Sequence, residues 1–302
     1  MIDYLDASST RFLNSLNGIS QRMDRAQREL TSGKRMNTVS DDPDQVGTLL
    51  QYRADSEMNA RTQTSLGRVK TEVDTAESVM ASSVRLLQQA RVLTAQGSTG
   101  TATAEERASL ADQLGNILQQ LSTMANTTVE GRYVFSGDSD QTSPYTIDLT
   151  QAVPYSTYLG TAATRQVLTT SGTTISVSKT AQDIFDTQTP GQQSVFAAIN
   201  DARLAFQAND QTAINTAAAE IDSAGTYLNV QHEFYGSAQL QVNNAIDTAQ
   251  TTATRLKTQI SQVEDADATA AILDLSNAIL QQNAALQSRA KMPRTSLFDY
   301  LG

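Results

Sequence analysis

The chain has 302 residues, a formal charge of −10 at pH 7, one histidine, and neither cysteine nor tryptophan. The absence of cysteine excludes disulfides, thiolate metal sites and thiol nucleophiles, and the acidic balance argues against a nucleic-acid-binding surface, which needs clustered Lys and Arg. Because only 5% of the residues are aromatic, the core is expected to be thin, as in paired helices. No apolar run approaches the length of a membrane span, so we predict no membrane insertion.

The first thirty residues carry one narrow apolar stripe on an otherwise polar segment. Its members recur three, four or seven residues apart, which is the heptad pattern of a coiled coil. Such a stripe needs a partner, because most helices in proteins owe their stability to packing of the apolar face. We predict an amphipathic helix with the contact residues Leu5, Phe12, Leu16, Ile19, Met23 and Leu30.

Residue types mark the end of this helix and the start of the next. Gly33 suits the left-handed conformation that ends many helices. Asp42 followed by Pro43 is typical of a helix start, with an aspartate as cap and proline in the first turn. We therefore predict a hinge over residues 34–41.

A long helical pattern begins at Pro43 and stops in the Gly- and Thr-rich segment 96–102. Thr103 and Glu106 then have the spacing of a capping box, and an apolar ladder follows over residues 110–124. We expect these two segments to form a pair of antiparallel helices.

The periodicity changes in the middle of the chain, where short alternating runs are separated by turn residues. These runs are typical of strands, and Ser171-Gly172 is predicted to be a hairpin turn. Residues 138–186 are therefore expected to be a small β insertion, with strands at residues 145–149, 165–169 and 174–177.

Helix is predicted again at residues 192–208 and from Gln211, where an apolar ladder leads to Val263. The stripe resumes at Ile272, nine residues later, which lies on the opposite side of a helix that turns about 100° per residue. We predict one continuous helix that changes its buried face near Asp267.

The C-terminal stripe is the predicted partner of the N-terminal one, and its members are Ile272, Leu275, Ile279 and Leu286. An apolar tail follows, which contains Leu297, Phe298 and Leu301. We expect another molecule to cover this tail. A single narrow seam offsets little of the entropy of ordering an arm. Our hypothesis is that the terminal arms are disordered in the free chain and fold when neighbouring molecules bury them.

Three regions follow from these patterns. Residues 1–40 with 266–302 are predicted to be terminal coiled-coil arms, residues 41–137 with 187–265 a helical bundle domain, and residues 138–186 a β-rich outer insertion.

The sequence contains few residues that could form a catalytic or metal site. His232 is the single histidine, so one chain cannot assemble a multi-histidine metal site, and a His-paired nucleophile would have to use this one residue. Carboxylates cluster at residues 41–44 and 264–267, but capping explains Asp42, and the second cluster is expected in solvent. We predict that the chain is not an enzyme and has no catalytic residue, metal ligand or cofactor.

Several segments resemble the signatures of flagellins and flagellar hook-associated proteins. These are residues 30–35 (LTSGKR), 40–43 (SDDP) and 260–267 (ISQVEDAD). Residues 131–137 (GRYVFSG) and 296–301 (SLFDYL) are similar to the members of this family found at the hook–filament junction. The chain is identified as a member of the flagellin-like family on these segments.

The resemblance implies a mainly α fold with a small β insertion: an elongated antiparallel helical bundle with terminal coiled-coil arms, flagellin-like. It implies a structural adaptor of the bacterial flagellum, extracellular and exported by the flagellar type III pathway without a cleaved signal peptide. The implied partners are hook-associated protein 1, flagellin, further copies of the chain in a helical ring, and a flagellar export chaperone. The alternatives are a filament flagellin subunit and a secreted helical adhesin or translocator.

Overall fold

The computed structural model describes residues 7–38, 40–169 and 172–291. The predicted contact residues Leu5, Leu297, Phe298 and Leu301 lie outside this part of the chain. The chain is mainly helical with small strand pairs, which confirms the predicted fold class. It divides into two compact units: unit 1 holds the residues up to Met58 and from Thr252 onward, and unit 2 holds residues 59–251.

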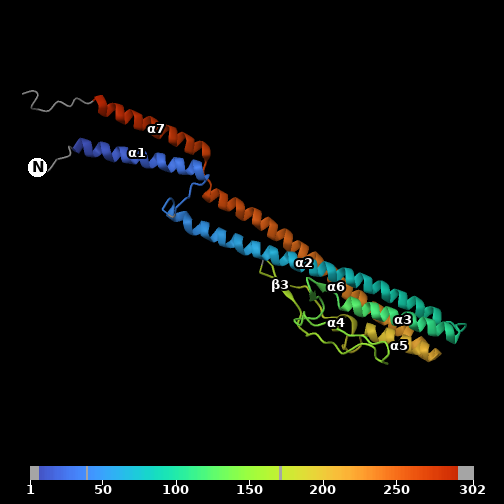
Figure 1. Cartoon of the computed structure of the whole chain (residues 1–302). Helices are drawn as coiled ribbons and strands as arrows, with labels where there is room; N and C mark the ends of the chain where they lie inside the picture. Colours follow the sequence, from blue (N-terminus) through green and yellow to red (C-terminus); the bar gives the residue numbers. More distant parts are fainter. Residues whose placement is uncertain (1–6, 39, 170–171, 292–302) are drawn as a thin grey trace, which may run out of the picture. The chain divides into compact units, whose positions relative to one another are not determined.

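Helices dominate the described chain (Figure 1), and two of them, α2 and α6, contribute to both units. In chain order the helices are α1 (Ala7–Ser32), α2 (Pro43–Gly97), α3 (Ala104–Ala125), α4 (Ala181–Phe185), α5 (Val195–Gln207), α6 (Gln211–Glu264) and α7 (Ala268–Lys291).

Several predicted helix ends are confirmed. Gly33 follows the last residue of α1 with φ +69°, a conformation that costs glycine little because it has no Cβ. α2 begins at Pro43, and the carbonyl oxygen of Asp42 accepts from the backbone N–H of Val46 (3.2 Å). Thr103 and Glu106 form the predicted capping box, since each side chain accepts from the backbone N–H of the other.

The prediction of one continuous helix through Asp267 is wrong, because residues 265–267 separate α6 from α7. The backbone N–H of Ala266 donates to the carbonyl oxygen of Gly33 (3.0 Å) rather than to its own helix. The side chain of Asp267 accepts from the backbone N–H of Thr269 (2.8 Å) and so caps α7. The phase change of the apolar stripe marked a break between two helices.

Unit 2 is built around the antiparallel pair α2 and α6. Polar contacts follow the pair along its length: Asp74 with Gln239 (2.7 Å), Glu77 with His232 (3.1 Å), and Arg91 with Asp222 (2.7 Å). α3, α4 and α5 complete a core that gathers many of the aromatic rings. Its largest buried members are Met80, Leu114, Leu118, Leu121, Phe135, Tyr145, Ile184, Phe185, Phe196, Phe206 and Tyr235.

Two short hairpins make up the strands of unit 2. β1 (Thr128–Val129) pairs with β2 (Arg132–Tyr133) across a turn in which Glu130 and Gly131 both have positive φ. β3 (Gln166–Leu168) and β4 (Thr174–Ser176) pair antiparallel. These two strands confirm the predicted strands at residues 165–169 and 174–177. Their inward side chains Val167 and Ile175 pack with residues of α2 and α6.

The predicted strand at residues 145–149 is wrong: a single bridge, Ile147 with Tyr155, is all that the described chain forms there. The side chain of Asn126 explains this, because it accepts from the backbone N–H of Tyr145 (3.1 Å) and donates to its carbonyl oxygen (2.7 Å). A side-chain amide thus satisfies the backbone groups of Tyr145, the first residue of the predicted strand, in place of a strand partner.

Candidate assembly site

The predicted N-terminal stripe packs against α7. Along α1, Ile19 and Ala26 are buried, while Phe12, Leu16, Met23 and Leu30 are half-buried and most residues between them are exposed. α1 and α7 lie side by side and antiparallel (Figure 1), since Arg22 donates to Gln281 (2.9 Å) and Arg289 to Ser9 (2.7 Å). The heptad ladder therefore faces a helix of the same chain.

The face that α7 turns toward α1 is not the predicted one. Ala271 and Ala278 are its buried residues, with Leu275, Gln282 and Ala285 half-buried beside them. These positions are four, three, four and three apart, which is a coiled-coil seam. Small alanine side chains opposite the larger residues of α1 allow the two helices to approach closely.

Of the predicted C-terminal stripe, only Leu275 belongs to this seam. As contacts of the N-terminal stripe in the same chain, Ile272, Ile279 and Leu286 are wrong, because they are exposed by 59%, 40% and 48%. Sequence reasoning favoured the largest apolar residues as the seam. The signal that it missed was the alanine repeat on the adjacent side of the helix.

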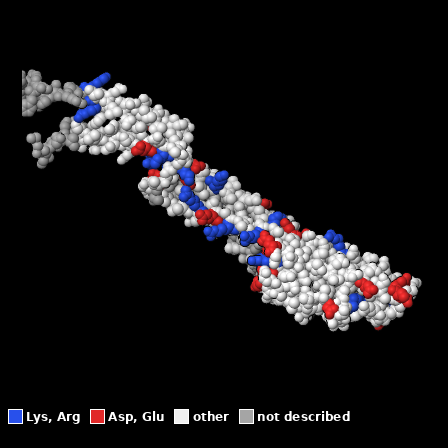
Figure 2. Space-filling view, viewed as in Figure 1, with Lys and Arg blue, Asp and Glu red and all other residues white. Residues whose placement is uncertain are grey.

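α7 consequently carries a second apolar face, which the described chain leaves uncovered. We call it the outer face of α7, and its exposed members are Ile272, Leu273, Ile279, Leu280 and Leu286. They form two columns at spacings of seven residues. Between Ala268 and Ser288 the only charged residue is Asp274, and most of the α1–α7 surface in Figure 2 is white, the colour of uncharged residues.

Four helix ends meet inside unit 1, where the segment between α1 and α2 pairs with the segment between α6 and α7. We call this region the joint, residues 33–42 with 263–267. Lys34 and Asp265 form an antiparallel β-bridge, and the carbonyl oxygen of Glu264 accepts from the backbone N–H of Arg35 (2.8 Å). These backbone hydrogen bonds tie the two segments to each other.

Glu264 carries the charge at the centre of the joint and is 4% exposed. Its carboxylate pairs with the Lys34 ammonium and with the Arg53 guanidinium (2.8 Å). Burial alone would raise the pKa of Glu264, but hydrogen bonds and charges from Lys34 and Arg53 outweigh it and lower that pKa below its usual value. The expectation that this acidic cluster faces solvent is therefore wrong for Glu264.

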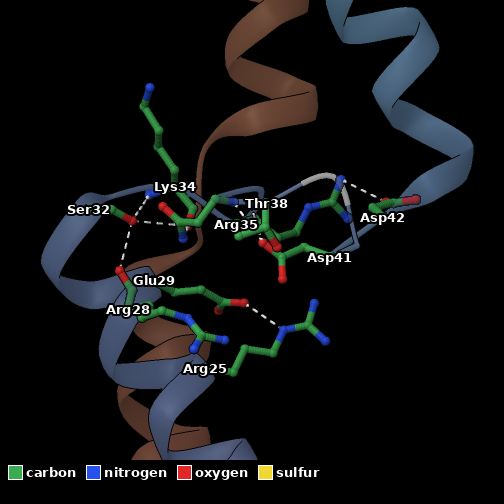
Figure 3. Close-up of polar contacts among 10 residues, drawn as sticks. Arg25, Arg28, Glu29, Ser32, Lys34, Arg35, Thr38, Asp41 and Asp42 are labelled. Carbon is green, nitrogen blue, oxygen red and sulfur yellow. Dashed lines mark hydrogen bonds and ion pairs between the residues drawn. The ribbon is translucent and has the colours of Figure 1, made fainter.

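The longer segment of the joint is folded by its own polar side chains (Figure 3). The Asp41 carboxylate accepts from the backbone N–H groups of Thr38 (2.6 Å) and Asn37 (2.9 Å), and the hydrogen bond from Thr38 is the largest cause of its lowered pKa. Arg35 pairs with Asp42 (3.5 Å). The predicted hinge is thus a loop held by several polar contacts. Bending at this loop stays a prediction.

The residues that were candidates for chemistry make structural contacts. His232 lies on α6 beside Glu77, where it links two helices. Within the described residues, Asp, Glu and His side chains do not gather into a group of three or more that could hold a metal ion. Among the described helices, none combines the length and apolarity that crossing a bilayer requires.

Two family models match the chain. The bacterial flagellin N-terminal helical region matches residues 6–140, and the bacterial flagellin C-terminal helical region matches residues 212–301. The two matched stretches include α1, both segments of the joint and α7.

Individual relatives agree with the family models. Flagellar hook-associated protein 3 of Escherichia coli is 25% identical over 256 residues, which cover 79% of this chain and 74% of the relative. Flagellin E of Vibrio cholerae is 29% identical over 131 residues, covering 40% of this chain and 32% of the relative. The solved structure of FlgL from Xanthomonas campestris has a TM-score of 0.59 and 14% identity, and the match covers 70% of this chain and 99% of that one.

Proposed function

Because the chain belongs to the flagellin family of structural flagellar proteins, we propose that it is a subunit of the junction between the flagellar hook and the filament. One observation carries the mechanical part of this proposal: α7 has two apolar faces, of which α1 covers one. The outer face of α7 is the surface through which the chain joins its neighbours.

The outer face has the spacing of a coiled-coil seam and the energy to drive assembly. Its aliphatic side chains recur every seven residues, so a second helix could pack along them. Burying each of the five side chains would contribute about 1 kcal/mol. Together these contributions are a large fraction of the stability of a small folded unit. Assembly through this face therefore stabilises the α1–α7 pair, as coupled folding of the arms requires.

The partners proposed for this surface are further copies of the chain, hook-associated protein 1 on the hook side and flagellin on the filament side. Before export, a cytoplasmic chaperone would cover the C-terminal apolar segment, and the protein would leave the cell without a cleaved leader. We assign the assembly contacts to the outer face together with the stripe of α1. Leu297, Phe298 and Leu301 are proposed to extend them.

The joint has a separate part in this mechanism. Its ion pairs and backbone hydrogen bonds link the terminal helices to the first turns of α2 and the last turn of α6. A load applied to α1 and α7 in the assembly would pass through Glu264, Lys34 and Arg53 into those helices. We propose that the joint transmits force between neighbouring layers of the junction.

A filament flagellin is the second candidate, because flagellin E aligns with the chain at 29% identity. The longer alignment with hook-associated protein 3, over 79% of the chain, favours the junction. Electron microscopy of the purified protein at high concentration separates the two candidates. Long filaments from this chain alone would support flagellin, whereas a junction protein is expected to stop at short assemblies.

The test of the assembly surface is Leu280→Asp, compared with Asn277→Asp at an exposed position of α7 outside that face. Both variants add one charge to α7, but only Leu280 belongs to the outer face. We expect Leu280→Asp to abolish filament attachment and shed filaments into the medium, and Asn277→Asp to retain attached filaments. Normal attachment in cells that make only Leu280→Asp would refute the proposed role of this face.

A further inference from the structure

Besides the outer face of α7, the chain has a surface in unit 2 whose shape and charge suit an interface between copies. A groove lies between α2 and α3, with an accessible volume of about 610 Å³. Its floor and edges include Val92 and Ile117, and its rim carries the amides of Gln89, Gln113 and Asn116. Arg85 supplies the charge of this groove, which we call the α2–α3 groove.

The outward side of α6 has the complementary form. Val230, Glu233, Ser237 and Leu240 recur three or four residues apart on the side opposite to the core, and all four are exposed. Val230 and Leu240 are exposed by 54% and 65%. We call this row the α6 ridge: a strip with one carboxylate and one hydroxyl between two apolar side chains.

The charge balance of the two helices supports their pairing between molecules. From Gln211 to Thr251, α6 contains four acidic residues and neither Lys nor Arg, whereas α2 from Asn59 to Gly97 carries five basic and three acidic residues. Arg85 donates to the Ser82 hydroxyl (2.9 Å). Among the ion pairs of the described chain, none involves Arg85 or Glu233, so each is available to an opposite charge on another molecule.

We infer that the α6 ridge of one copy docks in the α2–α3 groove of the next, with Val230 against Val92 and Glu233 between Arg85 and Gln89. A helix packs naturally as a ridge into the groove between two others. The two surfaces differ, so the contact is heterologous and continues from copy to copy around a ring or a helix. This inference rests on the proposed function for its setting, but uses a surface separate from α7.

The register is set by the direction of the helices. In a ring of copies that point the same way, the ridge of one copy runs antiparallel to the neighbouring α2. Placing Val230 at Val92 then puts Glu233 about three residues back along α2, a distance of about 4.5 Å. At that point its carboxylate lies among the groove amides and within reach of the Arg85 guanidinium.

The natural absence of cysteine allows a direct test with Val92→Cys combined with Val230→Cys. In one chain these positions cannot form a disulfide. The contact of Asp74 with Gln239 sets the register of α2 and α6 and places the two residues roughly 13 Å apart along the axis, whereas bridged Cα atoms lie within about 7 Å. A disulfide therefore reports a contact between two molecules.

Flagella are isolated from cells that make only the double variant, oxidised, and analysed by denaturing electrophoresis. We expect a ladder of covalent multimers of this chain, and only monomer from either single variant. Dimers without higher multimers, cross-links to a different flagellar protein, or monomer alone would each overturn the inference. Absence of the wild-type chain from isolated flagella would instead refute the proposed function, so the two failures are distinguishable.

A charge exchange keeps the test valid if the cysteine variant fails to assemble. Arg85→Glu and Glu233→Arg are each expected to lower the amount of chain in isolated flagella at least several-fold, and the combined variant to restore it. Arg68→Glu, an exposed position of α2 outside the groove, is the matched control and should have no effect. Failure of the combined variant to restore incorporation would overturn the inference.

Discussion

Glu264 is the residue at which two signature segments from opposite halves of the chain meet. Residues 30–35 and 260–267 resemble family signatures in sequence, and the joint gives a physical reason for their residue types. Gly33 has a positive φ, Lys34 pairs with the buried carboxylate of Glu264, and Asp267 caps the helix that follows. Of these three roles, the pairing of Lys34 with Glu264 is the direct contact between the two segments.

Removing the cations that pair with Glu264 should cost much more stability than removing the carboxylate itself. Replacing both Lys34 and Arg53 by alanine leaves a buried carboxylate without a counter-charge, which we expect to cost about 3 kcal/mol. Glu264→Gln removes the buried charge and should cost only about 1 kcal/mol, because both cations are half-exposed and regain water. Urea unfolding followed by circular dichroism measures both losses.

Lys70→Ala is the control for these variants, since it breaks a half-exposed i,i+4 ion pair with Asp74 on one helix. Such pairs contribute about 0.3–0.5 kcal/mol. Equal losses for Glu264→Gln and for the double alanine variant would contradict a buried charge at the joint.

The lowered pKa of Glu264 also predicts a pH dependence. Its folded-state pKa lies below the unfolded value of about 4.3. The stabilisation is therefore present above that unfolded value and is lost as the pH falls through the folded pKa. We expect the difference in melting temperature between wild type and Glu264→Gln to be constant from neutral pH to about pH 5 and to shrink in stronger acid. A difference that grows on acidification would have the wrong sign.

At the scale of the element, α7 is a helix with two seams. Ala271 and Ala278 pack toward α1, and the large aliphatic residues lie on the outer face. An alanine seam between helices tolerates little extra volume, because added methylene groups in a packed contact typically cost 1–3 kcal/mol. The exposed side of the same helix has no such restriction.

Ala278→Leu and Ala284→Leu test this difference with one substitution at two positions of α7. Ala278 is buried and Ala284 is exposed. We expect Ala278→Leu to speed hydrogen exchange along α1 by about fivefold or more, as 1–3 kcal/mol of destabilisation implies, and Ala284→Leu to leave it unchanged. Similar exchange in the two variants would mean that the alanine face is not the seam.

At the scale of the whole molecule, burial is distributed unevenly. The described parts of α1 and α7 contain four buried apolar residues, Ile19, Ala26, Ala271 and Ala278, whereas unit 2 contains two large clusters. Regions with few buried contacts open more readily than densely packed ones. The terminal helices should therefore be the least protected part of the isolated chain.

Limited proteolysis of the dilute protein checks this expectation. We predict early cleavage in α1 and α7 and a persistent fragment of about residues 40 to 265, identified by mass spectrometry. The same digestion of isolated flagella should spare the terminal helices, because neighbours cover the outer face of α7. Full protection of Phe12 or Ile279 in the dilute protein would contradict assembly-coupled folding.

Much of the local structure could be read from the sequence by itself. Heptad spacing predicted α1, the proline at position 43 predicted the start of α2, and the Thr103–Glu106 pair predicted the start of α3. These features depend on residues within a few turns of one another, so a local pattern determines them. Family membership also followed from short contiguous segments and was confirmed by the two matched regions.

The tertiary structure decided which of two apolar faces of α7 meets α1, and it placed Glu264 in a buried ion pair rather than in solvent. Periodicity marked both faces of α7, but the choice between them depends on how closely α1 approaches, a distance set by small alanines across the contact. Similarly, the burial of Glu264 depends on Lys34 and Arg53, which are more than two hundred residues away in the chain. Local pattern fixes where a helix forms, whereas only its neighbours in space determine what each face contacts.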